Sequence, residues 1–160
     1  MQEQLPQAKP DLRQPLHLLA FGFGSGLAPK APGTFGTLVA VPIYLLMQGL
    51  PLIAYLALVL AGFIAGIWIC DRTSRDLGVH DHGGIVWDEI IGYLLTMTLA
   101  PSGWVWVLLG FLLFRFFDIL KPWPIRWLDR RVPGGFGIML DDLIAGLFAG
   151  VVMLLIERGI

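Results

Sequence analysis

The chain has 160 residues, a length typical of a single domain. Apolar residues make up 56% of it and charged residues 14%, with a mean hydropathy of +0.74. A water-soluble domain of this size leaves much of its surface exposed and has too little interior for so much apolar area. The composition therefore predicts a membrane protein. The net charge of −1 argues against nucleic acid as a partner, and the single cysteine excludes an internal disulfide.

Apolar stretches follow one another along the chain, at 35–50, 52–70, 85–100, 104–120 and 143–156. Several are shorter than the roughly 20 residues that cross a hydrocarbon core perpendicularly. Short turns containing Gly and Pro, at 48–51 and 101–103, join two pairs of them. We expect an all-α fold, a polytopic membrane bundle of about four to five short apolar helices.

Basic side chains are unevenly distributed along the chain. Nine of the eleven Lys and Arg lie in the N-terminal region, in the loop 71–84 or in the loop 121–141, while the turns 48–51 and 101–103 carry no charge. Positively charged loops of membrane proteins stay in the cytoplasm. We therefore expect the polar site at the cytoplasmic ends of the helices.

A glycine-rich segment, 22–37, leads into the first apolar helix. Glycines let backbone N–H groups approach a phosphate, and a helix N-terminus favours an anion. Lys30 and Thr34 are therefore candidate phosphate contacts. The segment has neither a Walker motif nor GxGxxG spacing, so a re-entrant turn without a ligand is the alternative.

His80 and His82 flank an aspartate in the charged loop. Their i, i+2 spacing matches no standard zinc site. Either histidine is a candidate proton donor to a leaving alkoxide, and a solvated loop is the alternative.

Asp88 and Glu89 lie at the start of the apolar stretch 85–100. A carboxylate in such surroundings needs a cation, a proton or a hydrogen-bonding partner. Adjacent helix positions point about 100° apart, so we do not expect both side chains to be equivalent ligands of one ion. The alternative is a helix N-terminus with favourably placed acids.

Arg115, Asp118 and Lys121 recur at three-residue spacing, which predicts one helix face that combines basic and acidic groups. Such a face suits a site for a metal ion together with an anion, with Arg126 as a further phosphate contact. The alternatives are an internal ion-pair ladder and, for Lys121 and Arg126, anchors that reach the lipid head groups.

Asp141 and Asp142 follow a glycine-rich turn and are predicted to open the last apolar helix, where the alternative is a simple N-cap. Clustered carboxylates are the hard oxygen ligands that Mg²⁺ prefers. We expect Mg²⁺ to be held by a subset of the candidate acids, and catalysis to depend on Asp88, Glu89, Asp118 and Asp142. The full set of candidate ligands is Asp88, Glu89, Asp118, Asp141 and Asp142.

Four blocks of sequence, in this order, resemble the phosphatidylglycerophosphatase A family. They run from His17-Leu18-Leu19-Ala20 to Pro32-Gly33-Thr34, from Val79-His80-Asp81-His82-Gly83 to Val86-Trp87-Asp88-Glu89, from Phe114-Arg115 to Pro124-Ile125-Arg126-Trp127, and from Gly134-Gly135 to Asp141-Asp142. The resemblance implies a single membrane domain over 17–160, preceded by a variable tail, 1–16.

The resemblance further implies a Mg²⁺-dependent phosphomonoesterase of the bacterial inner membrane. Its substrate would be phosphatidylglycerophosphate and its product phosphatidylglycerol, with the site facing the cytoplasm and no protein partner indicated. Two other classes remain open. A transporter would place its charges near mid-span, whereas here they gather at helix ends, and a small membrane assembly factor would carry a charged cytoplasmic collar without catalysis.

Overall fold

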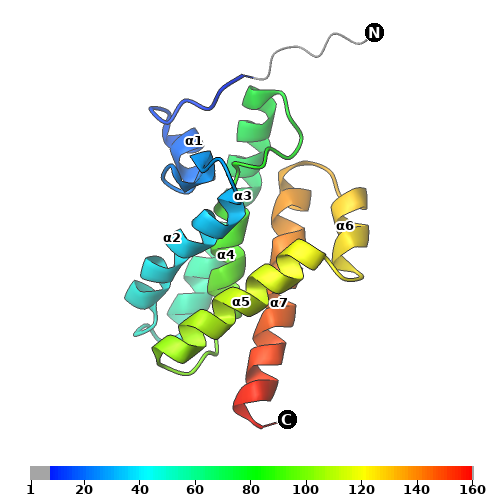
Figure 1. Cartoon of the computed structure of the whole chain (residues 1–160). Coiled ribbons are helices and arrows are strands. Elements are labelled where there is room, and N and C mark those ends of the chain that lie inside the picture. Colours follow the sequence, from blue (N-terminus) through cyan, green and yellow to red (C-terminus); the bar gives the residue numbers. More distant parts are fainter. Residues whose placement is uncertain (1–7, 160) are drawn as a thin grey trace.

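The computed structural model describes residues 8–159, and over this part of the chain the fold is all-α (Figure 1). Seven α-helices and one short 3₁₀ helix are present in the described residues. They are α1 (Pro15–Ala20), η1 (Ser25–Leu27), α2 (Pro32–Met47), α3 (Leu52–Leu77), α4 (Trp87–Thr96), α5 (Trp104–Leu120), α6 (Ile125–Arg131) and α7 (Gly134–Glu157).

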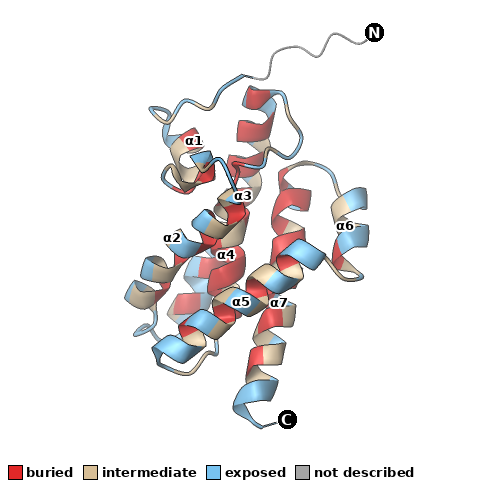
Figure 2. Ribbon diagram, in the orientation of Figure 1, coloured by how far each residue is buried: buried red, intermediate tan, exposed pale blue. Residues whose placement is uncertain are grey.

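Two helices, α3 and α7, are long and apolar enough to cross a membrane, and α2 is a shorter apolar helix. Large apolar side chains are exposed on the outside of the bundle, Ile53 at 84% and Val105 at 74%, for example. Figure 2 shows exposed surface along the outer faces of α3 and α5. These features indicate association with a membrane, in agreement with the composition.

Helix α7 packs against α3, α4, α5 and α6 and so forms the centre of the bundle. Glycines allow the close approach of its backbone to two neighbours. A Cβ atom at Gly135 would lie 1.9 Å from the carbonyl oxygen of Ile67 on α3, and one at Gly146 would lie 2.5 Å from that of Gly92 on α4. Small residues let apolar helices pack closely where no water drives their association.

The ends of the bundle differ in polarity. The turns 48–51 and 101–103 lie at one end, as their position between apolar stretches predicted, while α6 and the loop between α3 and α4 lie toward the other (Figure 1). Helix α4 is shorter than the stretch 85–100, because it begins at Trp87 and ends at Thr96.

The start of the last helix was predicted wrongly. Helix α7 begins at Gly134, so Asp141 and Asp142 are in its interior and do not cap it. The N–H of Gly134 donates to Nε2 of His80 at 3.2 Å, and the N–H of Gly135 donates to Oδ1 of Asp71 at 3.2 Å. Partners from α3 and the following loop thus satisfy the first amide groups, and the glycine-rich turn becomes helical.

Candidate metal and phosphate site

Three carboxylates meet between α4 and α7. Asp88 and Glu89 belong to the first turn of α4, and Asp142 comes from the third turn of α7. One oxygen from each lies within 4.8 Å of the other two. Asp88 and Glu89 therefore both bring an oxygen close to Asp142, although adjacent helix positions point in different directions. We call these three residues the acidic triad.

The acidic triad has the chemistry of a cation site. Asp88 and Asp142 are only 8% and 2% exposed. Each triad residue also has a buried oxygen with no hydrogen-bond partner, namely Oδ1 of Asp88, Oε2 of Glu89 and Oδ2 of Asp142. Buried carboxylate oxygens without partners are costly. Because an oxygen-binding cation would satisfy all three, the residues present fit a hard divalent metal such as Mg²⁺.

A basic group lies beside the triad. Nη1 of Arg115 donates to Oδ2 of Asp118 one turn along α5, and both side chains are largely buried. The Nε of Arg115 has no partner among the described residues. The sequence predicted this pair on one helix face, and the structure confirms that the two side chains contact each other.

The N-terminus of α2 reaches the same place. A Cβ atom at Gly33 would lie 2.7 Å from Oε1 of Glu89 and 2.9 Å from Nη1 of Arg115. Only a glycine leaves room here for the carboxylate and the guanidinium to approach the helix backbone. The Oγ1 of Thr37 donates to the carbonyl oxygen of Gly33 at 2.8 Å and thereby orders this first turn.

The two phosphate contacts predicted in the glycine-rich segment differ in position. Thr34 lies in the first turn of α2, next to Gly33, and is partly buried. Lys30 is exposed in the turn before the helix and forms no ion pair with any described residue. Thr34 therefore follows the glycine that approaches Glu89 and Arg115, whereas Lys30 lies outside the helix.

Lys121 ends helix α5 and does not continue its face. Its backbone is left-handed, with φ of 46°, and its Nζ lies 3.0 Å from Oδ2 of Asp141 and 3.3 Å from Oδ1 of Asp129. Burial by itself lowers the pKa of Lys121, but the two carboxylates outweigh this effect and hold the pKa above the ordinary value. Lys121 is thus paired with Asp141, which precedes Asp142 of the triad on α7.

Arg126 and the two histidines make backbone contacts. Arg126 is exposed, and its Nη2 donates to the carbonyl oxygen of Leu120 at 3.0 Å. Nε2 of His80 accepts the N–H of Gly134, and Nδ1 of His82 accepts the N–H of Gly84 at 2.9 Å. Neither histidine belongs to the acidic triad.

Comparison with known proteins assigns the chain to a family. The profile of the phosphatidylglycerophosphatase A family matches residues 18–157. The chain belongs to the phosphatidylglycerophosphatase A family. No solved structure matches it. The match contains the acidic triad, Arg115 and the N-terminus of α2, so the site described above lies wholly within the part of the chain shared with the family.

Three relatives show how much of the chain is shared. A phosphatidylglycerophosphatase A of Escherichia coli K12 is 50% identical over 143 residues, which are 89% of this chain and 83% of that protein. One of Haemophilus influenzae Rd is 46% identical over 159 residues, or 98% of each chain. A Bacteroides thetaiotaomicron protein, provisionally named a phosphatidylinositol-3-phosphatase, is 38% identical over 144 residues, or 85% of this chain and 89% of that protein.

Sequence reasoning did not single out Gly33, Asp129 or Asp71 as parts of the site in this family member. Gly33 stood within the recognised glycine-rich block, but its contacts are with α4 and α5, which are far away in the chain. Asp129 lies in an arginine-rich segment, and no sequence pattern distinguished it. The structure shows that it forms an ion pair with Lys121. Asp71 lay in the segment 71–84, which was predicted as a charged loop, whereas the structure places it in α3, where it accepts the N–H of Gly135.

Proposed function

We propose that this chain hydrolyses the terminal phosphomonoester of phosphatidylglycerophosphate to phosphatidylglycerol and phosphate, with Mg²⁺ held by the acidic triad. Membership in the phosphatidylglycerophosphatase A family supports the substrate and the reaction. The observation that carries the mechanism is the triad of carboxylates, each with a buried, unpartnered oxygen, beside the guanidinium of Arg115 and the N-terminus of α2.

Of the five acids predicted as ligands, we assign Asp88, Glu89 and Asp142 to the metal. Asp118 and Asp141 are paired with Arg115 and Lys121, so we assign them to positioning these cations. When bound, Mg²⁺ supplies positive charge for the phosphoryl oxygens and lowers the pKa of an attacking water.

The chain's own cations and helix dipole would receive the phosphate. Phosphoryl transfer depends mainly on positioning and on stabilising charge at the phosphoryl oxygens. Arg115 offers a planar guanidinium that can bind two oxygens. The N-terminus of α2, beside Thr34, offers the positive end of its helix dipole, because Pro32 has no N–H and the N–H groups of Thr34 and Phe35 donate to the carbonyl oxygen of Ala31. Lys30 and Arg126, both exposed, would contact the head group as it enters. A triad carboxylate would accept the proton of the attacking water.

The leaving group is the hydroxyl of phosphatidylglycerol and needs a proton. His80 and His82 stay the predicted donors. Both rings accept a backbone N–H, which fixes their tautomer and leaves the other ring nitrogen to carry a proton.

A stripe of exposed apolar side chains on α5 supports a membrane-embedded, multi-pass arrangement. Its members recur every three or four residues and are all more than half exposed: Val105, Leu108, Leu112, Phe116 and Ile119. A helix of 17 residues with such a stripe is best explained by contact with lipid. We propose one membrane domain, 17–160, after a tail, 1–16, in the bacterial inner membrane with the triad toward the cytoplasm.

The decisive test is single-turnover release of phosphate from phosphatidylglycerophosphate, with and without Mg²⁺. We expect Mg²⁺-dependent release from the wild type and strong loss in Asp88→Asn and Asp142→Asn. Glu157→Gln is the matched control, because this exposed acid lies about 22 Å further along α7 than Asp142. A phosphoinositide monophosphate is the comparison substrate that the Bacteroides relative suggests.

Two outcomes would contradict the proposal at different levels. Wild-type rates without Mg²⁺ in both triad variants would refute the metal-carboxylate mechanism while leaving the enzyme in place. No release from any lipid phosphomonoester would refute the enzymatic function itself, and it would favour a transporter or a non-catalytic assembly factor.

A further inference from the structure

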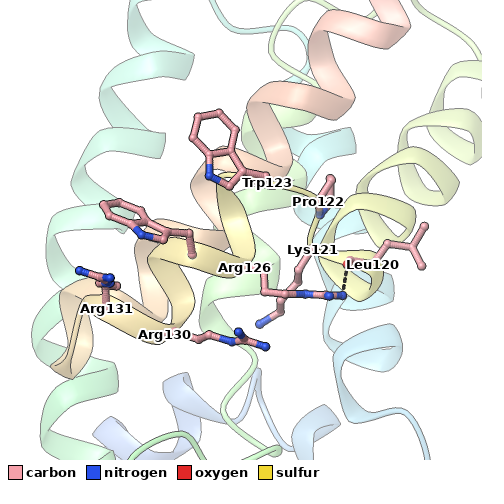
Figure 3. A pocket seen from close by; sticks show the side chains of 8 residues that line it. Leu120, Lys121, Pro122, Trp123, Arg126, Arg130 and Arg131 are labelled. Carbon is pink, nitrogen blue, oxygen red and sulfur yellow. Dashed lines mark hydrogen bonds between the residues drawn. The ribbon is translucent and has the colours of Figure 1, made fainter.

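A basic and aromatic cavity lies along α6 and the turn before it, and no residue of the acidic triad lines it. It has a volume of about 480 Å³ (Figure 3). We call it the α6 pocket and define it by the side chains of Lys121, Trp123, Arg126, Trp127, Arg130 and Arg131. The mechanism above uses only Lys121 and Arg126 of this set, so most of the pocket has no assigned role.

The charge of the α6 pocket is positive and largely uncompensated. Lys121 is paired with two carboxylates. In contrast, Arg126, Arg130 and Arg131 form no ion pair with any residue between 8 and 159. Arg126 and Arg130 are four residues apart on α6 and share one side of it (Figure 3). Their guanidinium groups therefore offer several free donors to an anion.

Two tryptophans, Trp123 and Trp127, also line the α6 pocket. Trp123 is 79% exposed and Trp127 is 48% exposed, and the guanidinium of Arg131 lies 5.4 Å from the ring centre of Trp127. Large exposed indoles are costly in water, but they are favoured at the boundary between lipid head groups and acyl chains. Arginine at this boundary binds phosphate through its planar fork of donors.

We propose that the α6 pocket binds the phosphodiester of an anionic phospholipid of the surrounding bilayer. The unpaired guanidinium groups bind the negative phosphodiester, and the indole rings pack against the adjacent glycerol and the upper part of the acyl chain. Lys121 lines the pocket and pairs with Asp141, which precedes Asp142 of the triad on α7, so this ion pair links the pocket to the candidate active site. Bound lipid would hold α6 at the membrane surface beside the point where the substrate's head group enters. This inference rests on the proposed membrane location and needs no turnover.

The test uses the full chain in a neutral detergent, with bound lipids counted by native mass spectrometry. Dioleoylphosphatidylserine has a net negative charge, whereas dioleoylphosphatidylcholine carries the same phosphodiester without one. We expect the wild type to bind the first about tenfold more tightly, because charge-assisted hydrogen bonds are strengthened by an unneutralised anion. Inorganic phosphate, added at equal concentration, should not displace the lipid.

The variant Arg130→Gln/Arg131→Gln should lose about tenfold in affinity for the phosphatidylserine, since it removes two fork donors. Arg126 is kept because it is a proposed substrate contact. Arg13→Gln/Arg158→Gln is the matched control: it removes the same charge from two other exposed arginines and should bind within about twofold of the wild type. Trp123→Ala, at a highly exposed position, gives an independent arm and should also weaken binding.

Three results would overturn the proposal. The first is equal affinity for phosphatidylserine in the wild type and in both pocket variants. The second is equal binding of phosphatidylserine and phosphatidylcholine by the wild type. The third is displacement of the lipid by inorganic phosphate, which would identify a site for free anions. Phosphate release by the wild type, measured in the same detergent, tests the proposed enzymatic function separately. A failure of the lipid-binding proposal is therefore distinguishable from a failure of the proposed enzymatic function.

Discussion

Replacement of Gly33 by alanine should separate activity from stability. The added Cβ would lie 2.7 Å from Oε1 of Glu89 and 2.9 Å from Nη1 of Arg115. Both atoms are at the far ends of flexible side chains, so these side chains would move and the backbone of α2 would not. The substitution therefore displaces one triad carboxylate and the candidate phosphate-binding guanidinium together.

The expected loss of activity in Gly33→Ala follows from these two contacts. A normal carbon–oxygen contact needs roughly 0.5 Å more than the 2.7 Å found here. Displacements approaching 1 Å at a reacting centre cost up to about 100-fold in rate, so we expect kcat to fall by about 10- to 100-fold. Folding should not suffer, because alanine is favoured over glycine in a helix by up to about 1 kcal/mol.

The assay is phosphate release from phosphatidylglycerophosphate in neutral detergent, with the thermal midpoint measured on the same sample. Gly49→Ala is the control, because a Cβ atom there meets nothing within 4 Å. We expect wild-type kcat in the control and an unchanged or slightly raised midpoint in Gly33→Ala. Wild-type kcat in Gly33→Ala would refute the role assigned to this contact, and a collapsed midpoint would show that the side chains cannot yield.

Three further predictions concern metal and polar contacts. Chelation of Mg²⁺ should abolish turnover, and its return should raise the thermal midpoint, since a ligand of the folded state stabilises it; no shift would argue against a folded-state metal site. Lys121→Met should destabilise the fold by about 3–5 kcal/mol, because Asp141 stays buried without its cation. The measurement is unfolding in mixed micelles, and Lys121→Met/Asp141→Asn should recover part of the loss. His80→Ala should speed hydrogen exchange at Gly134, whose N–H loses its acceptor, at a cost of about 1 kcal/mol; unchanged exchange would refute the contact.

The sequence alone determined the fold class and the polarity of the molecule. Two pairs of apolar stretches, each joined by a short uncharged turn, correspond to α2 with α3 and to α4 with α5, because hydropathy is a local property. The segregation of basic residues between apolar segments also needed no tertiary information. Residue chemistry likewise indicated that acids on apolar helices serve a cation, and the four sequence blocks indicated the family that the comparisons confirm.

The tertiary structure decided which acids act together. Five carboxylates were equivalent as candidates in the sequence, but Asp88, Glu89 and Asp142 form the acidic triad, while Asp118 and Asp141 each have a basic partner. The reason is that α7 extends back to Gly134 and packs against α4 through close glycine contacts, which no local pattern encodes. The gathering of charge between the apolar segments was thus predictable from the sequence, whereas the grouping of these side chains into the acidic triad, the ion pairs beside it and the α6 pocket depends on how distant helices pack.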